Sequence, residues 1–277
     1  MFNVYSGLLK MMDDFRDDGM DVQLKYLIDD DYSELKNTYH LDEIAGSGSD
    51  FQKAVNLLNW ISSHIYHYGN YDNHVRNTAM DLFDYAFDKG ENRGINCRSL
   101  SLALTECLLA VGVKTRTVYI LPFSPYDFDN HVVSECWIEE LNKWVLFDPT
   151  YNLYFSDKDG TPLGILELRQ KLAEQEEIVF SELANYNGNP LNKDEIITYY
   201  AKDMFRFLLS DTQAPNSEEV SGRKIIHITP VGYNVKKASL ANIDFRIKNW
   251  GDSPAMQNWR KNEQETEVIY KGIELLK

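Results

Sequence analysis

The chain has 277 residues, of which 43% are hydrophobic and 13% aromatic, so it is long enough to bury a large core. Its formal net charge of −15 disfavours a nucleic-acid partner, because phosphates need a basic surface, and it equally disfavours an anionic membrane face. Three cysteines are too few for a disulfide framework in a chain of this length and indicate a reducing compartment.

The N-terminus also favours a soluble, cytoplasmic protein. Residues 1–20 carry acidic side chains where a signal peptide would have a basic region followed by an apolar run. No stretch approaches the roughly 20 apolar residues of a membrane span. We therefore expect no association with a membrane.

The first 49 residues are predicted to form an N-terminal helical segment that packs on the main body. The acidic run Asp29–Asp31 is interpreted as a solvated surface or a helix start rather than a cation site, because three consecutive carboxylates cannot all point one way. A turn over 46–50 then ends in an N-cap. Apolar residues at helical spacing predict an amphipathic helix over 51–65.

Three histidines lie on this helix and at its exit, namely His64, His67 and His74, and the first two are predicted to share one helical face. Histidine is a common metal ligand. No cysteine pair or His-Glu-x-x-His pattern stands nearby, so surface or packing roles are favoured. A metal-dependent hydrolase built on these histidines is the least favoured reading.

The next strong pattern predicts a buried helix that begins at Cys97. Apolar or small residues recur from there at three- and four-residue steps. Asn96 is a good N-cap, and Gly112 suits the left-handed position after the last turn. Unpaired backbone N–H groups and the helix dipole favour a thiolate at the first turn, and the same N–H groups bind oxyanions.

Two strands are predicted after this helix and a strand over 115–121. His131 opens the first, and the second covers 143–147 and ends at Asp148. The short, even-length link between them predicts a hairpin with His131 and Asp148 on the same face. Together with Cys97, this is the layout of a Cys-His-Asp nucleophilic site.

The loop over 122–130 directly precedes His131 and contains two prolines and two acidic residues. A loop in this place is interpreted as a rim or lid that selects the substrate, or as a simple reversal of the chain by its prolines.

Three motifs in this region resemble the core of the transglutaminase-like superfamily, a branch of the papain-like thiol enzymes: Gly94-Ile-Asn-Cys97, Asn130-His131-Val-Val-Ser-Glu-Cys-Trp and Lys143-Trp-Val-Leu-Phe-Asp148-Pro-Thr. Three such motifs in the right order and at the right spacing occur by chance much less often than any one of them alone. The resemblance covers roughly residues 50–170. It implies that Cys97 is the nucleophile, His131 the general base and acid, and Asp148 the residue that orients the imidazole.

Other residues near these motifs are given structural roles. Transglutaminases use a tryptophan upstream of the cysteine to help hold the oxyanion, but the sequence around Trp60 does not match that motif, so core packing is favoured. Cys107 and Cys136 are interpreted as structural, because a lone cysteine on an apolar face is usually buried and inert.

The remainder of the chain carries no motif with assignable chemistry. A calcium loop at Asp157–Gly160 is rejected in favour of a turn, because Phe155 offers no ligand and Glu167 is out of register. Segment 185–193, rich in Asn, Gly and Pro, is the best candidate for a boundary. Further elements are predicted as helices over 164–177, 194–209 and 239–250 and a strand over 224–229.

The predicted fold class is α+β and papain-like or transglutaminase-like, with the nucleophile helix packed on an antiparallel sheet and extra N- and C-terminal helices. We expect a single domain over 1–277. Within it, a helical segment over 1–49 precedes a transglutaminase-like catalytic core over 50–180, and an extension over 190–277 packs on that core.

The predicted function is that of a cysteine hydrolase, an amidase, protease or related acyltransferase, which acts on amide bonds of a peptide, protein or glycopeptide through a thioester. Water is the default acceptor, since no calcium-site pattern typical of regulated crosslinkers is visible. The alternative is a catalytically silent transglutaminase-like domain that binds a peptide or sugar-peptide. We expect no cofactor, no metal, no nucleic-acid partner and no membrane partner, and the sequence does not indicate an oligomeric state.

Overall fold

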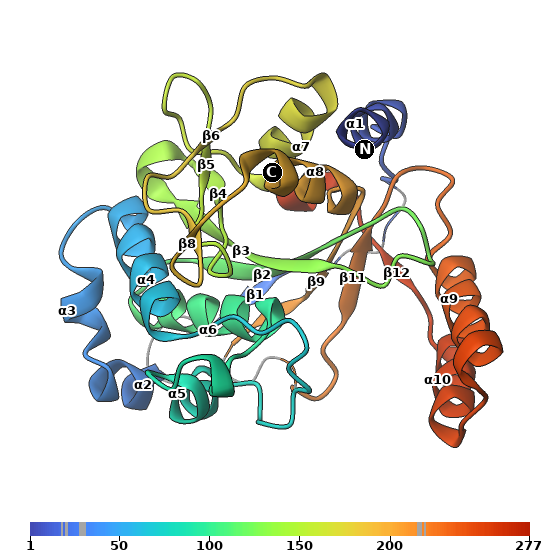
Figure 1. Cartoon of the computed structure of the whole chain (residues 1–277), viewed down its shortest axis with the longest axis horizontal. Helices are drawn as coiled ribbons and strands as arrows, with labels where there is room; N and C mark the ends of the chain where they lie inside the picture. The colour runs from blue at the N-terminus through green and yellow to red at the C-terminus, as the bar shows by residue number, and fades with distance from the viewer. Residues whose placement is uncertain (18, 20–21, 28–31, 215–217, 219) are drawn as a thin grey trace.

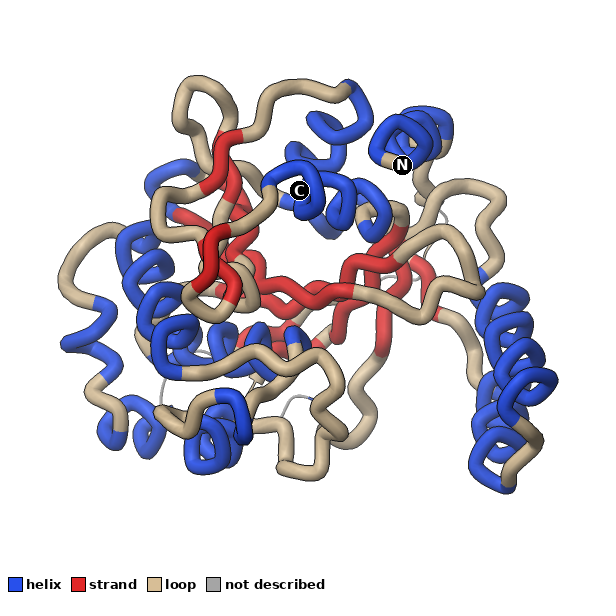
Figure 2. The backbone as a smooth tube through the Cα atoms, in the orientation of Figure 1, coloured by secondary structure: helices blue, strands red, loops and turns tan. Residues whose placement is uncertain are grey.

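The computed structural model describes residues 1–277 except 18, 20–21, 28–31, 215–217 and 219, and the acidic run Asp29–Asp31 therefore lies outside the described residues. A mixed sheet runs through the molecule and has helices on both faces (Figures 1 and 2). The predicted α+β fold class is confirmed. No helix in the described ranges has the length and apolar character needed to cross a bilayer.

Within the described residues the main sheet has six strands in the order β12-β11-β9-β2-β3-β4. All neighbours are antiparallel except β11 and β12. The bounds are Thr115–Leu121 for β2, His131–Ile138 for β3, Lys143–Phe147 for β4, Arg206–Ser210 for β9, Ile225–Ile228 for β11 and Ile269–Tyr270 for β12. The predicted strand over 115–121 and the predicted hairpin that follows are both present.

One face of the sheet buries α6 (Cys97–Ala110), the helix predicted to carry the nucleophile. Around α6 pack α4 (Asp50–His64), α5 (Ala79–Ala86) and the shorter α2 (Ser33–Thr38) and α3 (Leu41–Ala45). The helix is buried almost all round because it lies between the sheet and these helices.

The opposite face of the sheet is covered by α1 (Phe2–Met11), α7 (Ile165–Glu174) and α8 (Lys193–Asp203). The helical hairpin α9 (Val235–Trp250) and α10 (Pro254–Glu265) lies beyond the end of the sheet that carries β11 and β12 (Figure 1). Short ladders complete the fold: β1 (Lys25–Tyr26) with β10 (Thr212–Gln213), β5 (Phe155–Ser156) with β6 (Val179–Phe180), and β7 (Asn185–Tyr186) with β8 (Asn189–Pro190).

The prediction of one helix over 194–209 is wrong for its last six residues. Helix α8 ends at Asp203, and Arg206–Ser210 forms β9 between β2 and β11. Phe207 and Leu209 are buried on one face of that strand, which is an alternation of period two. Pairing with strands distant in sequence decides the conformation of this segment, since its local spacing also fits a helix.

The segment over 185–193 contains a tight hairpin. Asn187 and Gly188 stand at its turn with φ of 50° and 80°, which is the left-handed pair that a two-residue hairpin turn favours. The side chain of Asn187 accepts a hydrogen bond from the N–H of His67 at 2.8 Å and donates one to the carbonyl of His67 at 3.1 Å. This hairpin is thereby held against the chain that leads to Cys97.

A fully buried ion pair connects the sheet to two distant segments. The Arg116 guanidinium on β2 donates to Glu135 on β3 at 2.7 and 3.0 Å, and both side chains are at most 1% exposed. Arg116 also donates to the carbonyls of Leu275 and Leu276, and the other oxygen of Glu135 accepts the N–H of Ile165 at 3.0 Å. The pair therefore fixes the C-terminal turn and the start of α7 to the sheet.

We expect Arg116→Met to lower the free energy of unfolding by about 3–5 kcal/mol, because it leaves a buried carboxylate without its partner. Urea denaturation of the purified variant measures this. The matched control is Lys143→Met, which removes the surface partner of Glu167 and should cost less than about 1 kcal/mol. Equal losses in the two variants would contradict the role given to the buried pair.

Candidate active site

Cys97 stands at the first position of α6, and its backbone is fixed on both sides. The Asn96 side chain accepts the N–H of Ser99 at 3.1 Å, as an N-cap does. Before it, Ile95 pairs with the chain at Tyr66 and Tyr68 through two backbone bonds of 3.0 and 2.8 Å. A side chain at Gly94 would meet Tyr68 Cβ at 2.7 Å, which explains the glycine of the motif.

The amide N–H groups of Cys97 and Arg98 make no hydrogen bond to any residue that the structure describes. They are among the unpaired donors that every helix N-terminus presents. The thiol of Cys97 is half-buried, whereas Cys107 and Cys136 are fully buried. Burial raises the pKa of both buried thiols, which keeps them protonated and structural.

His131 and Asp148 meet across the β3–β4 hairpin. The register pairs Ser134 with Phe147 and Cys136 with Val145, which places positions 131 and 148 on the same face. His131 Nε2 lies 2.7 Å from Asp148 Oδ2, and the two side chains are 2% and 0% exposed. The predicted shared face is confirmed.

Burial alone would lower the pKa of His131, but the Asp148 carboxylate and a hydrogen bond with the Cys97 side chain raise that pKa well above its ordinary value. Since Nε2 is bonded to Asp148, Nδ1 is the ring nitrogen that remains for the thiol. The structure thus brings all three predicted residues together in the arrangement that activates a nucleophile.

Two further donors hold the Asp148 carboxylate. The N–H of Thr150 donates to Oδ1 at 2.9 Å, and the hydroxyl of Tyr200 donates to Oδ2, the oxygen that His131 also contacts. Tyr200 comes from α8 and is fully buried. Sequence reasoning missed it, because one tyrosine on an apolar helix face carries no local sign of a polar partner.

Aromatic rings surround the imidazole of His131. The ring centroids of Tyr199 and Tyr151 lie 5.4 and 5.7 Å from it, and the Tyr200 centroid lies at 5.8 Å. Burial raises the pKa of each of these phenols, so they stay neutral hydrogen-bond donors. The site is a low-dielectric pocket in which charge interactions are strengthened.

A second carboxyl group, that of Asp203, lies near His131 but does not replace Asp148 as its charged partner. Burial raises the pKa of Asp203 to about 8, against the lowering effects of Lys202 and His131. Neither oxygen of Asp203 accepts a hydrogen bond among the described residues. At neutral pH Asp203 is therefore mostly protonated, and Asp148 provides the negative charge at His131.

His67 was expected on the same helical face as His64, and that expectation is wrong because α4 ends at His64. His67 instead forms a β-bridge with Ile95. Burial and the nearby charge of His131 lower the pKa of His67 to about 4, so the ring is neutral at neutral pH. Its Nδ1 lies 3.0 Å from the hydroxyl of Tyr186.

The other aromatic and histidine assignments concern packing and surface contacts. Trp60 packs edge-on against Tyr39 and Phe83 with centroid distances of 6.0 and 5.5 Å, so its core role is confirmed. His64 bonds to Asp88 at 2.7 Å and His74 bonds to Asp72. Within the described residues no group of three or more His, Cys, Asp or Glu side chains could hold a metal ion.

Residues 39–149 match the family model of the transglutaminase-like superfamily, which confirms the resemblance carried by the three motifs. No curated protein matches the sequence significantly. Among solved structures, the chain is similar to a protein from Cytophaga hutchinsonii named as a candidate cysteine protease. The alignment has 16% identity and a TM-score of 0.34, and it covers 58% of this chain and 51% of that one, about half its length.

Because the pKa of His131 is raised in the fold, its ion pair with Asp148 stabilises the protein below the ordinary histidine value of about 6.5. This contribution is lost as the pH rises through the folded-state pKa. In Asp148→Asn the carboxylate no longer opposes the effect of burial and the Cys97 side chain alone still does, so the pKa of His131 should fall well below its value in the wild type. The variant should lose more stability at mildly acidic pH than at alkaline pH.

An NMR titration of the His131 ring and urea denaturation at the two pH values measure both effects. Asp72→Asn, which removes the partner of the exposed His74, is the matched control and should shift neither. A His131 pKa that stays high in Asp148→Asn would contradict the assigned cause.

Proposed function

We propose that this protein is a cysteine hydrolase that cleaves amide bonds of a peptide, protein or glycopeptide through a thioester on Cys97. The observation that best supports the proposal is the buried bond between His131 and Asp148, with the Cys97 thiol at the other side of the imidazole. A transglutaminase-like core over 39–149 agrees with this chemistry.

In the acylation step, the thiolate of Cys97 attacks the carbonyl carbon of the amide while His131 carries the proton. A C–S bond forms, and the electron pair of the carbonyl moves to its oxygen. When the oxyanion collapses, the C–N bond breaks and His131 protonates the leaving amine. Asp148, fixed by Tyr200 and Thr150, holds the imidazole with Nδ1 toward the sulfur.

In the deacylation step, His131 takes a proton from water, whose oxygen attacks the thioester. The C–S bond breaks, the product leaves as a carboxylic acid, and Cys97 regains the thiolate with a protonated His131. An amine in place of water would give a crosslink by the same steps. Hydrolysis is the proposed outcome, because water reaches every half-buried site.

The oxyanion is proposed to bind to the free N–H of Cys97 and to His67. When the hydroxyl of Tyr186 donates to Nδ1 of His67, the proton of the neutral ring lies on Nε2 and can be donated. A pKa of about 4 keeps the ring in this neutral form. The β-bridge to Ile95, two residues before Cys97, keeps His67 close to the nucleophile.

We expect iodoacetamide at mildly acidic pH to alkylate Cys97 selectively, because Cys107 and Cys136 are buried and protonated. Incubation with mixed peptides and N-glycosylated peptides in ¹⁸O-labelled water should yield products labelled at the new carboxylate. Mass spectrometry reads both results. Cys97→Ala should abolish cleavage and retain the fold, whereas cleavage by this variant would overturn the proposed function.

A cleft that binds peptides without cleaving them would give a different pattern. Cys97 would then resist alkylation, and no product would form with either protein. Binding of the peptides in the absence of cleavage would identify the silent domain.

His67→Phe should lower kcat by about 10²–10³ with little change in KM, because one oxyanion donor is lost while the ring contact with Tyr186 is kept. Cys97 alkylation should continue, since His131 and Asp148 are untouched. The control is His64→Phe at the end of α4, which should retain the wild-type kcat. An unchanged kcat in His67→Phe would remove His67 from the mechanism.

A further inference from the structure

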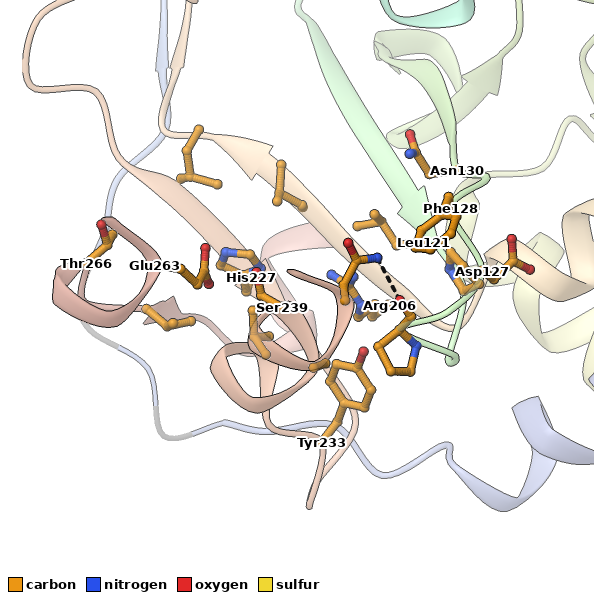
Figure 3. A pocket seen from close by; sticks show the side chains of 18 of the residues that line it. Leu121, Asp127, Phe128, Asn130, Arg206, His227, Tyr233, Ser239, Glu263 and Thr266 are labelled. Atoms are coloured by element: carbon orange, nitrogen blue, oxygen red, sulfur yellow. Dashed lines mark hydrogen bonds between the residues drawn. The ribbon is translucent and has the colours of Figure 1, made fainter. Parts of the chain in front are cut away.

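A cavity of about 640 Å³ lies between the sheet and the α9–α10 hairpin, apart from the three candidate catalytic residues. The loop over 122–130 forms one wall, and Asn130 connects this wall to His131. Figure 3 shows Arg206 and His227 reaching into the space from the sheet and Ser239 and Thr266 lying on the helical side. The volume is that of a small-molecule site.

Arg206, on β9, brings a guanidinium into this cavity, and none of the described carboxylates is paired with it. Its Nε is buried and donates no hydrogen bond to the described part of the chain. Burial lowers the pKa of Arg206, and the groups that oppose this effect are the phenols of Tyr233 and Tyr270 rather than a carboxylate. A cation whose Nε is buried, with no counter-ion among the described residues, is costly, so its presence calls for an anion.

His227, on the neighbouring strand β11, presents a second unpaired nitrogen. Its Nδ1 is buried and has no hydrogen-bond partner among the described residues. Burial and the charge of Arg206 lower the pKa of His227 to about 4, so the ring is neutral at neutral pH. It therefore adds one hydrogen bond and no further charge.

The opposite wall supplies aromatic surface and a rigid frame. Arg246 on α9 lies over the ring of Phe128 at 4.1 Å, and its Nε donates to Asn242 at 2.8 Å. Asn242 in turn donates to the carbonyl of Pro125 at 2.7 Å, which ties α9 to the loop. Trp259 also lines the space. An apolar body fits against these rings.

The acidic side chains near the cavity do not neutralise Arg206. Asp127 and Asp129 lie 3.4 and 3.1 Å from the ammonium of Lys202. Glu263, on α10, does not contribute to the pKa of Arg206 or of His227. The cavity is also lined by Arg223, Lys224, Arg246 and Glu267. Arg206 is the lining cation whose buried Nε has no partner among the described residues, so one carboxylate would balance it and a phosphate dianion would exceed its charge.

We propose that this cavity binds a small organic acid, with its carboxylate on Arg206 and His227 and its apolar part against Phe128 and Trp259. Cys97 does not line this cavity, so the binding proposal is independent of the proposed hydrolase function.

Calorimetric titration with phenylacetate, its neutral isostere phenylacetamide and phenyl phosphate tests the proposal. Phenylacetate should bind to the wild type at least about tenfold more tightly than either other probe. Arg206→Met should weaken phenylacetate binding by about tenfold or more. Arg206→Lys should weaken it less, because lysine keeps the positive charge but lacks the planar guanidinium that donates two parallel hydrogen bonds to a carboxylate. Cys97→Ala and the surface variant Lys143→Gln should bind like the wild type.

The stability of the ligand-free protein distinguishes a ligand-binding arginine from a purely structural one, because replacing Arg206 should change the urea midpoint in opposite directions in the two cases. Without ligand, Arg206→Met should raise the urea midpoint, because it removes an uncompensated buried charge, whereas loss of a structural contact would lower the midpoint. Three results would each overturn the proposal: no binding of millimolar phenylacetate to the wild type, equal binding of phenylacetate and phenylacetamide, or a lower midpoint in Arg206→Met.

Discussion

The register of the β3–β4 hairpin is the constraint on which the rest of the site depends. Side chains alternate between the two faces of a sheet, so a slip by one residue would send Asp148 to the face opposite His131. The strand also ends at this point, and Asp148 exchanges two backbone bonds of 2.8 and 3.0 Å with Leu153. That tight turn holds the carboxylate beside the imidazole, and it also places the N–H of Thr150 on the second oxygen.

Burial makes this pairing strong and at the same time demands that every polar atom be satisfied. Moving a carboxylate out of water costs several kcal/mol. Attraction to an imidazolium offsets this cost only when the geometry is good and further donors bind the carboxylate oxygens. Asp148 receives those donors from His131, Tyr200 and Thr150. Asp203, which has no such donors, responds to burial by holding its proton instead. Asp203 thus holds its proton while Asp148 accepts hydrogen bonds from three groups, and the difference comes from their partners.

The features that sequence reasoning found are those with local signals. The N-cap at Asn96, the apolar face of α6 and the parity of the β3–β4 hairpin are all set by residues close together in the chain. Tyr200 was missed, and His67 was given only a surface or packing role, because the polar partners of both residues lie far away in sequence. Strand β9 was predicted as helix for a related reason. The spacing of its apolar residues fits both periods, and only pairing with β2 and β11 selects the strand.

The candidate site is built from two parts of the chain. Cys97, His131 and Asp148 lie within residues 39–149, the part that matches the transglutaminase-like model. The groups that surround them come from later segments: Tyr186 from the β7–β8 hairpin, and Tyr199 and Tyr200 from α8. Strand β9 adds Arg206 to the separate cavity beside α9 and α10. Because β9 lies beside β2 at the centre of the sheet, these later segments cannot be removed without opening the core. A core that matches a superfamily model and a wall built by later segments form the kind of arrangement in which one fold supports many substrates, because the wall can vary while the core is kept.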